Sequence, residues 1–358
     1  MTGSISGSIP GSITTQVPIP ELERVIARAL EAAGTAPVNA ASVARALSAA
    51  EVDGQKGHGL SRVPGYVAQV RAGKVKGHAV PVVRRPKPSV LAVDAGHGFA
   101  FPAFDRVVAE LPAMANAAGI AAALVSHSHH AGALGGLVER LADAGLIALM
   151  YASTPAAMAP WGGKRAVYGT NPLAFAAPRR DKPALLIDLA LTEVARSKLV
   201  AAAQKGEAIP LGWAVDEHGN PTTDAKAALK GNLLPAGGAK GAALALMVEV
   251  LASTLTGSRF GFEASSFLDD KDGPPDVGQM VIGIDAIGLT GGLTGGLTSD
   301  LAGGNDYFGR LEVLAGIIEA DGARLPGSRR LALRETARRD GVTVDTRLLA
   351  EVRALGQG

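Results

Sequence analysis

A histidine between two glycines, followed four residues later by an arginine, marks the segment best suited to chemistry, DGQKGHGLSRVPGY at residues 53–66. On a helix, His58 and Arg62 would project from the same face, because side chains four residues apart are neighbours. An imidazole that moves a proton beside a guanidinium that clamps a carboxylate suits a small anion with a C=O or C=N group. The alternative interpretation is structural, with a glycine turn, a capping histidine and a solvated arginine at a helix start.

Three more histidines follow an apolar run at residues 119–125, in the segment SHSHHAGA at 126–133. The run predicts a buried strand, and ligands often bind where such a strand opens into a glycine-containing turn before a helix. His127 and His129 would share a face if the strand continued, but no acidic partner for a zinc site lies nearby in sequence, so no metal is predicted. The alternative is an anion or nicotinamide site built from imidazoles and backbone N–H groups. For His127, a purely structural hydrogen bond is a further interpretation.

Two other segments combine turn residues with groups that could bind a ligand. In YGTNP at 168–172, the Thr170 hydroxyl and the Asn171 amide could contact a substrate, although Asn-Pro is also ordinary turn chemistry. In LLPAGGAKG at 233–241, a glycine pair and Lys240 precede a helix and could form an anion cradle. A flexible helix entry is the alternative there.

Composition and missing motifs exclude several classes of function. The chain has 358 residues, 47% of them hydrophobic, a net charge of +2 and no cysteine. Disulfides and thiolate chemistry are therefore excluded, and a reducing cytoplasm is the expected location. The absence of a basic stripe with aromatic residues argues against nucleic-acid binding, and no apolar run reaches the roughly 18 residues of a membrane span. The Rossmann glycine fingerprint, the Walker A loop and the G-x-S-x-G elbow are also missing.

The elements that must position these residues alternate between helices and strands. Apolar spacing predicts helices at 20–33, 38–50, 63–72, 104–118, 137–144, 194–204, 241–254, 307–319 and 345–355. Strands are predicted at 119–125, 146–151, 184–189 and 280–284, with an extended, proline-containing stretch at 80–93. The expected fold is mixed α/β (α+β), with a helical lobe built from both termini. The predicted division is a flexible tail at 1–17, a substrate lobe at 18–118, a cofactor domain at 119–285, and a segment at 286–358 that returns to the helical lobe and includes a flexible glycine-rich loop at 288–304.

In this order, the motifs resemble the type-2 malate/L-lactate dehydrogenase family, which includes sulfolactate dehydrogenases and the Δ1-piperideine-2-carboxylate/Δ1-pyrroline-2-carboxylate reductases. The resemblance covers residues 20–335 and rests on DGQKGHGLSRVPGYV, SHSHHAGAL, APWGG, YGTNPLAFAAP, LIDLALTEVARSKL, GNPTTDAKAAL, LLPAGGAKGAALALMVEVL and ARLPGSRR. The paired histidines, VPGYV and the last segment look most similar to the cyclic ketimine reductases.

This resemblance implies a homodimer with a non-Rossmann nicotinamide-binding domain, a mixed, largely antiparallel sheet, and NADPH or NADH as cofactor. It implies catalytic roles for His58, His130 and Lys198, and substrate contacts for Arg62, Tyr66 and Thr170. The cofactor would be lined by His129, His130, Ala131, Gly132, Ala133, Asp188, Leu189, Ala190, Gly238, Ala239, Lys240, Arg324, Pro326, Gly327 and Ser328.

Two positions depart from the ketimine reductase pattern. The family usually has serine where this chain has Gly57, and the ketimine reductases have an acid where it has Lys198. Lys198 instead looks like the hydroxyacid dehydrogenases. Three hypotheses follow: a reductase of small 2-imino or 2-oxo carboxylates, cyclic ketimines first; a malate- or lactate-type 2-hydroxyacid dehydrogenase; and a non-catalytic nucleotide-binding homologue.

Overall fold

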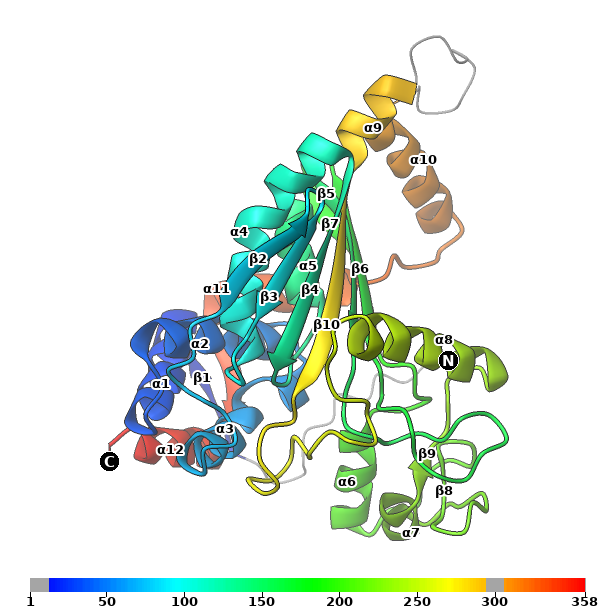
Figure 1. Cartoon of the computed structure of the whole chain (residues 1–358). Helices are drawn as coiled ribbons and strands as arrows, with labels where there is room; N and C mark the ends of the chain where they lie inside the picture. The colour runs from blue at the N-terminus through cyan, green and yellow to red at the C-terminus, as the bar shows by residue number, and fades with distance from the viewer. Residues whose placement is uncertain (1–12, 294–305, 358) are drawn as a thin grey trace.

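A seven-stranded mixed sheet forms the centre of the protein, in a computed structural model that describes residues 13–293 and 306–357 (Figure 1). Its strand order is β2-β3-β4-β10-β5-β6-β7. The strands are β2 (Val82–Lys87), β3 (Val90–Asp94), β4 (Ile120–Ser128), β10 (Val277–Asp285), β5 (Leu146–Ala152), β6 (Leu173–Arg179) and β7 (Lys182–Leu189). Only β3 and β4 pair in parallel, so the expected mixed, largely antiparallel sheet is confirmed. Strand β6 was absent from the sequence prediction.

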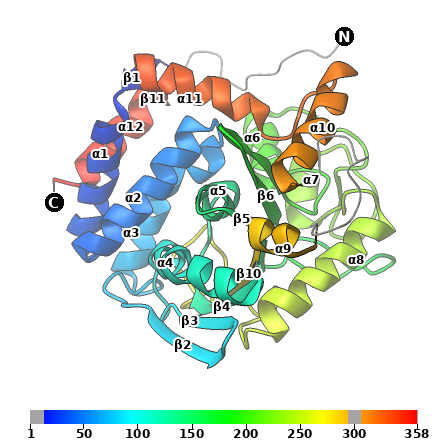
Figure 2. The same cartoon turned by 90° about the horizontal axis from the view of Figure 1, so that it is seen from above.

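Helices cover both faces of this sheet (Figure 2). Helices α4 (Ala100–Ala118) and α5 (Gly135–Asp143) pack on one face, and α8 (Ala239–Val248) with the π-helical turn η3 (Glu249–Thr254) lies on the other. Helix α4 continues through Pro112, as predicted, and ends at Gly119, whose φ of 80° suits glycine. The central strands β4 and β5 are alanine-rich and largely apolar, which suits a sheet that is covered on both sides.

The two ends of the chain form the predicted helical lobe, seen as blue and red elements together in Figure 1. Its helices are α1 (Ile19–Ala32), α2 (Pro37–Val52), α3 (Val63–Arg71) and α12 (Thr346–Leu355). In α1, Leu22, Ile26 and Leu30 recur every fourth residue and are completely buried. Strand β1 (Thr14–Val17) pairs antiparallel with β11 (Val342–Asp345). The predicted flexible tail at 1–17 is therefore wrong for residues 14–17, which form a strand, and residues 1–12 lie outside the described residues.

A small lobe follows β7 and has its own apolar core (Figure 1). It contains α6 (Arg196–Lys205), β8 (Ala214–Val215), α7 (Ala225–Lys230) and β9 (Asn232–Leu233). Leu199 and Ala202 on α6 are one turn apart and face the buried Ala225 and Ala228 of α7. This core is separate from the large one that joins the sheet to the helical lobe.

The C-terminal part runs along the sheet before it returns to the helical lobe. Helix α9 (Ala286–Leu293) includes the start of the glycine-rich repeat, so the predicted loop at 288–304 is wrong for residues 288–293, and residues 294–304 lie outside the described ranges. Helix α10 (Tyr307–Ala320) lies against β6, whereas α11 (Ser328–Asp340) packs on α2 and β11. The domain boundaries given above stay a prediction. Among the described helices, none is long and apolar enough to cross a membrane.

Candidate active site

His58 and Arg62 stand on two short 3₁₀ turns, η1 (Lys56–His58) and η2 (Leu60–Arg62), rather than on one α-helix. The predicted shared helical face is therefore wrong. Gly59 separates the turns, and a Cβ there would lie 2.1 Å from Glu51 Oε2, which instead accepts a hydrogen bond from Leu60 N at 2.9 Å. The Arg62 Nε donates to the Gly57 carbonyl at 2.7 Å. The backbone thus holds both side chains on one edge of the helical lobe.

A β-bulge in β4 decides where the other histidines point. The register shifts between the pairs Gln279↔Val125 and Val277↔Ser128, so β4 holds one extra residue, and His127 has a left-handed φ of 46°. The expectation that His127 and His129 share a face is wrong for this reason. His127 Nδ1 lies 3.0 Å from Asp94 Oδ1, consistent with the structural interpretation, whereas His129 is buried at 1% exposure. Within the described ranges, no three His, Cys, Asp or Glu side chains are grouped to hold a metal ion.

The centre of the candidate site is a group of rings that we call the histidine cluster: His58, Tyr66, His129 and His130. The rings of His58 and His130 stack with centroids 5.3 Å apart, although they come from different lobes. Tyr66 Oη lies 2.7 Å from His130 Nδ1 in a buried hydrogen bond. Residues predicted from two separate motifs therefore meet at one point.

The Phe267 ring lies beside the histidine cluster and was missed by the sequence analysis. Its ring centroid lies 4.9 Å from that of His130 and 5.5 Å from that of His129. The surrounding segment, EASSFLDDKDG at 263–273, has the composition of an exposed loop, and neither periodicity nor a motif singles out its aromatic residue. An aromatic side chain in an otherwise polar loop is the one signal that could have drawn attention to it.

Burial keeps the histidine cluster uncharged at neutral pH. It lowers the pKa of His58 to about 4, helped by the positive charge of Arg62, and lowers the pKa of His129 to about 3. Burial also lowers the pKa of His130 well below its ordinary value and raises that of Tyr66. His58 Nδ1 and both ring nitrogens of His129 are buried and have no hydrogen-bond partner among the residues that the structure describes. Buried polar atoms are normally paired, so these nitrogens mark a place prepared for a ligand or for water.

The segments expected to line the cofactor converge partly on Asp188, at the end of β7. Asp188 Oδ2 accepts hydrogen bonds from Gly135 N at 2.9 Å and from Gln55 Nε2 at 3.2 Å, so the turn after β4 and the segment 53–66 meet there. Burial raises the pKa of Asp188. Gly327 lies close by, since a Cβ on it would be 3.0 Å from the Leu186 carbonyl.

The remaining cofactor candidates divide into buried and open positions. Ala131 is buried, Gly132 has a left-handed φ of 67°, and Ala133 and Ala190 are half-buried. Leu189 is 43% exposed, and Ala239, Lys240, Arg324 and Pro326 are exposed. Gly238 opens α8 at φ 66°, and a Cβ there would approach the Trp161 ring at 3.2 Å. This glycine turn and the 324–328 segment therefore present open surface at two separate places.

These residues fit a nicotinamide dinucleotide. The unpartnered nitrogens of His129 and the buried, unpartnered Ser328 Oγ supply polar groups that a bound cofactor could satisfy. The N-terminal end of α8, with Gly238 at its cap, favours a phosphate, as do the exposed cations Lys240 and Arg324. The hydrophobic rings of Tyr66 and Phe267 suit an aromatic ring beside His130.

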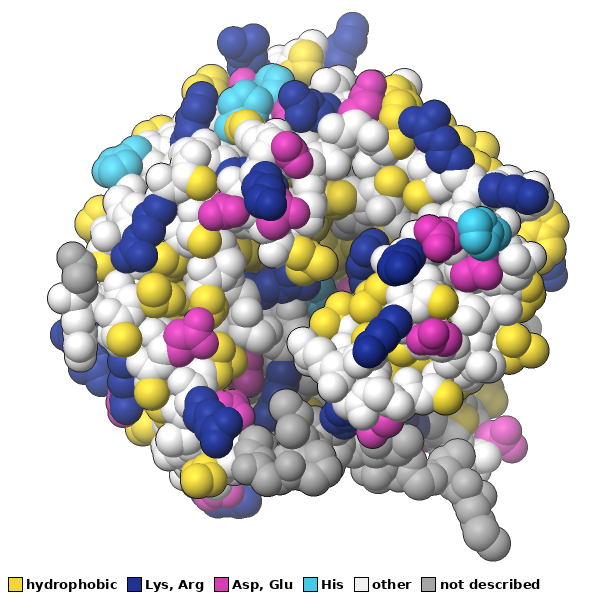
Figure 3. All heavy atoms as spheres, turned by 90° about the horizontal axis from the view of Figure 1, so that it is seen from below, with side chains coloured by type: hydrophobic (Ala, Val, Ile, Leu, Met, Phe, Trp, Pro, Cys, Tyr) yellow, Lys and Arg dark blue, Asp and Glu magenta, His cyan; other side chains and the backbone are white. Residues whose placement is uncertain are grey.

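Two predicted residues are not brought into contact with the histidine cluster. Thr170 N donates to Thr154 Oγ1 at 2.9 Å, and the two threonine hydroxyls lie 3.3 Å apart. Lys198 is exposed on the first turn of α6, with its ammonium 5.8 Å from the centroid of the Trp213 ring. Its neighbour Ser197 faces the motif, because a Cβ on Gly57 would lie 3.7 Å from Ser197 Oγ. Figure 3 shows a hollow in this face of the molecule, with lysine and arginine side chains near it.

Behind the candidate site lies a set of paired charges that we call the arginine cluster: Asp53, Glu139, Arg330 and Arg334. Arg334 Nη2 donates to Asp53 Oδ2 at 2.8 Å and to Glu139 Oε2 at 2.7 Å. Arg330, 7% exposed, donates from Nη2 to Glu139 Oε1 at 3.0 Å. Helix α11 thereby ties the segment 53–66 to α5. The sequence analysis did not predict α11 or this cluster.

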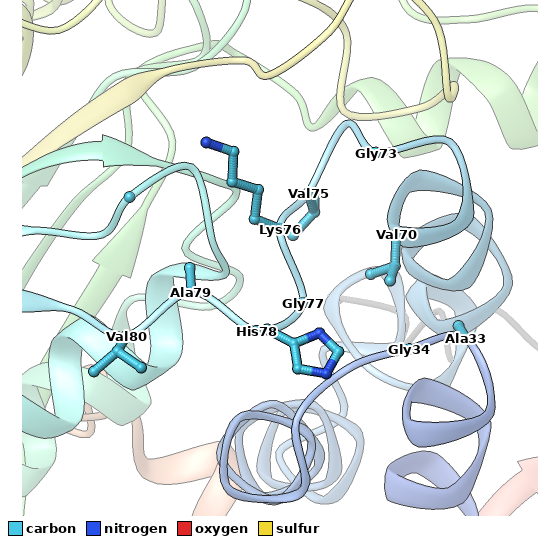
Figure 4. Close-up of a pocket in the computed structure, with 11 residues that line it drawn as sticks. Ala33, Gly34, Val70, Gly73, Val75, Lys76, Gly77, His78, Ala79 and Val80 are labelled. Atoms are coloured by element: carbon cyan, nitrogen blue, oxygen red, sulfur yellow. The ribbon is translucent and has the colours of Figure 1, made fainter.

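A cavity of about 630 Å³ lies between the loop after α1, α3 and residues 73–80 (Figure 4). Figure 4 shows His78 and Val70 bordering it, with the Lys76 side chain extending away from His78. None of its eleven lining residues carries a buried polar atom without a partner. The chemistry is therefore better placed at the histidine cluster.

Comparison with known proteins identifies the family. The sequence profile described as malate/L-lactate dehydrogenase matches residues 17–353. The chain belongs to this family. Its relatives include the (2R)-3-sulfolactate dehydrogenase (NADP(+)) of Chromohalobacter salexigens, 45% identical over 96% of this chain and 98% of the relative. The Δ1-pyrroline-2-carboxylate/Δ1-piperideine-2-carboxylate reductase of Pseudomonas aeruginosa is 40% identical over 94% and 97%.

A solved family structure supports the same assignment. The crystal structure of Δ1-piperideine-2-carboxylate reductase from Pseudomonas syringae superposes with a TM-score of 0.87 at 35% identity, covering 95% of this chain and 99% of that one. The family predicted from the motifs is thus confirmed, and the chain is an NAD(P)-dependent oxidoreductase. The role of each site residue stays a prediction.

Proposed function

We propose that this family member is an NAD(P)H-dependent reductase of small 2-imino carboxylates, cyclic ketimines such as Δ1-piperideine-2-carboxylate or Δ1-pyrroline-2-carboxylate. The observation that carries the proposal is the uncharged His58 beside Arg62. With its pKa lowered to about 4 by burial and by Arg62, His58 holds no dissociable imidazolium proton at neutral pH. A ketone needs a proton as its alkoxide forms, whereas an iminium arrives with its proton in place. The site is therefore better matched to the imine.

Five residues at or beside the histidine cluster have tasks in this reaction. Arg62 binds the substrate carboxylate through charge-assisted hydrogen bonds. His58 orients the substrate nitrogen, and its stacking on His130 fixes its plane. Tyr66 holds the His130 ring through the 2.7 Å hydrogen bond, and Phe267 excludes water from its face. When bound, the nicotinamide supplies the hydride that reaches C2 of the substrate.

NADPH is the proposed cofactor. Arg324 and Arg329 are exposed on either side of the Pro326-Gly327 turn and are available to an additional phosphate. Arg330 is not, because it is buried against Glu139. The 45% identical sulfolactate dehydrogenase is named as an NADP(+) enzyme, which agrees with this choice.

A 2-hydroxyacid dehydrogenase is the second candidate, and two observations favour it. A neutral His58 can accept the proton of a substrate hydroxyl, as oxidation requires. Lys198, where the ketimine reductases have an acid, is exposed next to Ser197, which faces Gly57. A non-catalytic homologue is the third candidate, motivated by the glycine at position 57, and would bind NADPH without turnover.

We further propose a cytoplasmic homodimer. Support for a dimer comes from four exposed large apolar side chains on α8, on η3 and directly after it, Leu244, Leu246, Val250 and Leu255, which are 42–52% exposed. Exposed apolar patches are typical of surfaces that associate. The absence of cysteine from the sequence supports a reducing compartment.

The decisive experiment measures oxidation of NADPH and of NADH with Δ1-piperideine-2-carboxylate, pyruvate and oxaloacetate at a fixed enzyme concentration. The proposal predicts the highest kcat/KM for NADPH with the imine. A preference for an oxo acid would move the enzyme to the hydroxyacid dehydrogenases. Tight NADPH binding without turnover of any acid would favour the non-catalytic candidate.

A further inference from the structure

A buried carboxylate outside the histidine cluster joins three separate segments of the chain. Glu249, the first residue of η3, is 4% exposed, and the proposed reaction does not use it. Its Oε1 accepts a hydrogen bond from Asn171 Nδ2 at 3.0 Å, and its Oε2 accepts one from Ser253 Oγ at 3.0 Å. The backbone N–H groups of Gly169 and Gly261 also donate to this carboxylate.

This environment is suited to a carboxylate and to no neutral replacement. Burial raises the pKa of Glu249, but the hydrogen bonds from Asn171 and Ser253 favour its ionised form. Every partner is a donor, and an ionised carboxylate is a pure acceptor with room for about four such bonds. The π-helical turn of η3 is itself unusual, because such turns are rare and often occur at functional sites.

Two of the donors flank Thr170. Asn171 is completely buried with a left-handed φ of 40°, so its side-chain bonds to Glu249 and to the Ala245 carbonyl hold a backbone that a non-glycine residue rarely adopts. At Gly169, an added Cβ would lie 2.0 Å from Thr154 Oγ1, so no other residue fits between the turn and Thr154. The position of the Thr170 hydroxyl is therefore set from both sides.

The second backbone donor, Gly261, connects Glu249 to the segment that carries Phe267. Gly261 begins the segment that carries Phe267, whose ring contacts His130. A Cβ on Gly261 would lie 2.9 Å from the Val167 carbonyl, so this segment is packed directly on the chain that leads to Thr170. At its far end, Gln69 Nε2 donates to the Phe267 carbonyl at 3.1 Å.

We propose that Glu249 is a positioning residue, whose carboxylate holds Thr170 and Phe267 in the relative placement that substrate binding requires. This inference rests on the proposed function for the identity of the substrate. Glu249 touches neither substrate nor cofactor in this scheme, and it acts through the 168–171 turn and the 261–267 segment.

Replacement of Glu249 by Gln tests the proposal. Gln has nearly the same volume, but its NH₂ group would face an N–H or O–H donor, which leaves a buried pair of donors unsatisfied. We expect KM for the preferred acid to rise about tenfold, with the Kd of NADPH in the absence of substrate changed less than twofold. Hydrogen exchange should accelerate in peptides covering 168–171 and 261–269. Glu217→Gln removes an exposed carboxylate outside both segments and should change none of these quantities.

Exchange rates or a KM equal to those of the parent enzyme would overturn the role of Glu249. If Glu249→Gln does not fold, Thr154→Val decides instead, because it removes the acceptor of Thr170 N–H; an unchanged KM in that variant overturns the proposal, and a raised KM supports it. Failure of the proposed function is recognised separately, since the parent enzyme would then reduce none of the acids. The exchange measurement still judges the placement of the two segments in that case.

Discussion

The histidine cluster and the arginine cluster both include residues of the segment 53–66 and of the chain from the end of β4 through α5, but they differ in how their polar groups are paired. In the arginine cluster, each carboxylate is paired with at least one guanidinium, at 2.7–3.0 Å, and Arg330 Nε is its single buried nitrogen without a partner among the described residues. In the histidine cluster, three ring nitrogens are buried without partners, and burial lowers the pKa of each histidine. Paired charges serve the scaffold, whereas unpaired buried nitrogens are expected where a ligand completes the bonding. Substitutions in the histidine cluster should therefore change turnover, and substitutions in the arginine cluster should change stability.

The largest effect is expected from His58→Ala. Removal of a general acid or base typically lowers a rate by about 10²–10⁴-fold, and we expect a loss in this range for oxidation of a 2-hydroxy acid, in which the uncharged His58 would accept the hydroxyl proton. The loss for a cyclic imine should be about tenfold or less, because the iminium already carries its proton. The measurement is kcat/KM for both substrates, together with the thermal midpoint of unfolding, which should change little. His78→Ala, at an exposed histidine, is the control. Equal losses on the two substrates would contradict the role given to His58.

The arginine cluster should respond in the opposite manner. Arg334→Met removes the partner of Asp53 and one partner of Glu139, and breaking a buried ion pair on one side typically costs about 3–5 kcal/mol. The expected result is a lower free energy of unfolding, measured in urea, while kcat of the remaining folded enzyme stays within a few-fold. Arg338→Met, one turn along α11 and exposed, should change stability by less than about 0.5 kcal/mol. A large loss of kcat in Arg334→Met without a loss of stability would show that the arginine cluster contributes to turnover rather than to stability.

The same contrast explains how much the sequence could reveal. The helices of the helical lobe and most strands of the seven-stranded sheet were predicted, because Leu22, Ile26 and Leu30 or the alanine-rich run of β4 carry clear periodicity. The short strands β1, β8, β9 and β11 were not predicted. Helix α11 was missed because its sequence, SRRLALRETARRD, is dominated by charges whose burial depends on partners 190 to 280 residues away. Long-range ion pairs of this kind leave no local pattern.

Within the candidate site, it was easier to predict which residues take part than where their side chains point. His58, Tyr66 and His130 meet as their motifs suggested, but the His58–Arg62 geometry was wrong because Gly59 breaks the helix where Glu51 approaches. The direction of His127 was wrong because a one-residue bulge reverses which face a strand residue occupies. Phe267 and Glu249 were missed because their importance comes from packing between segments far apart in the sequence.

The smallest predicted effect is an acid-dependent loss of stability that originates in the histidine cluster. A buried histidine with a lowered pKa binds a proton less readily when folded than when unfolded, so its contribution to stability is complete above the unfolded pKa and is lost as the pH falls. For His129, with a folded pKa of about 3, the loss begins near pH 6.5 and should reach about 1.5–2 kcal/mol at pH 5. His129→Phe keeps an aromatic ring among Tyr66, Phe99 and Phe267 but cannot titrate, so its stability should fall less between pH 6.5 and 5. Urea unfolding at these two pH values measures the difference, with His78→Phe as the exposed control. An identical pH dependence in His129→Phe and the parent enzyme would mean that His129 finds a partner in solution, and the cluster would then resemble its paired neighbour.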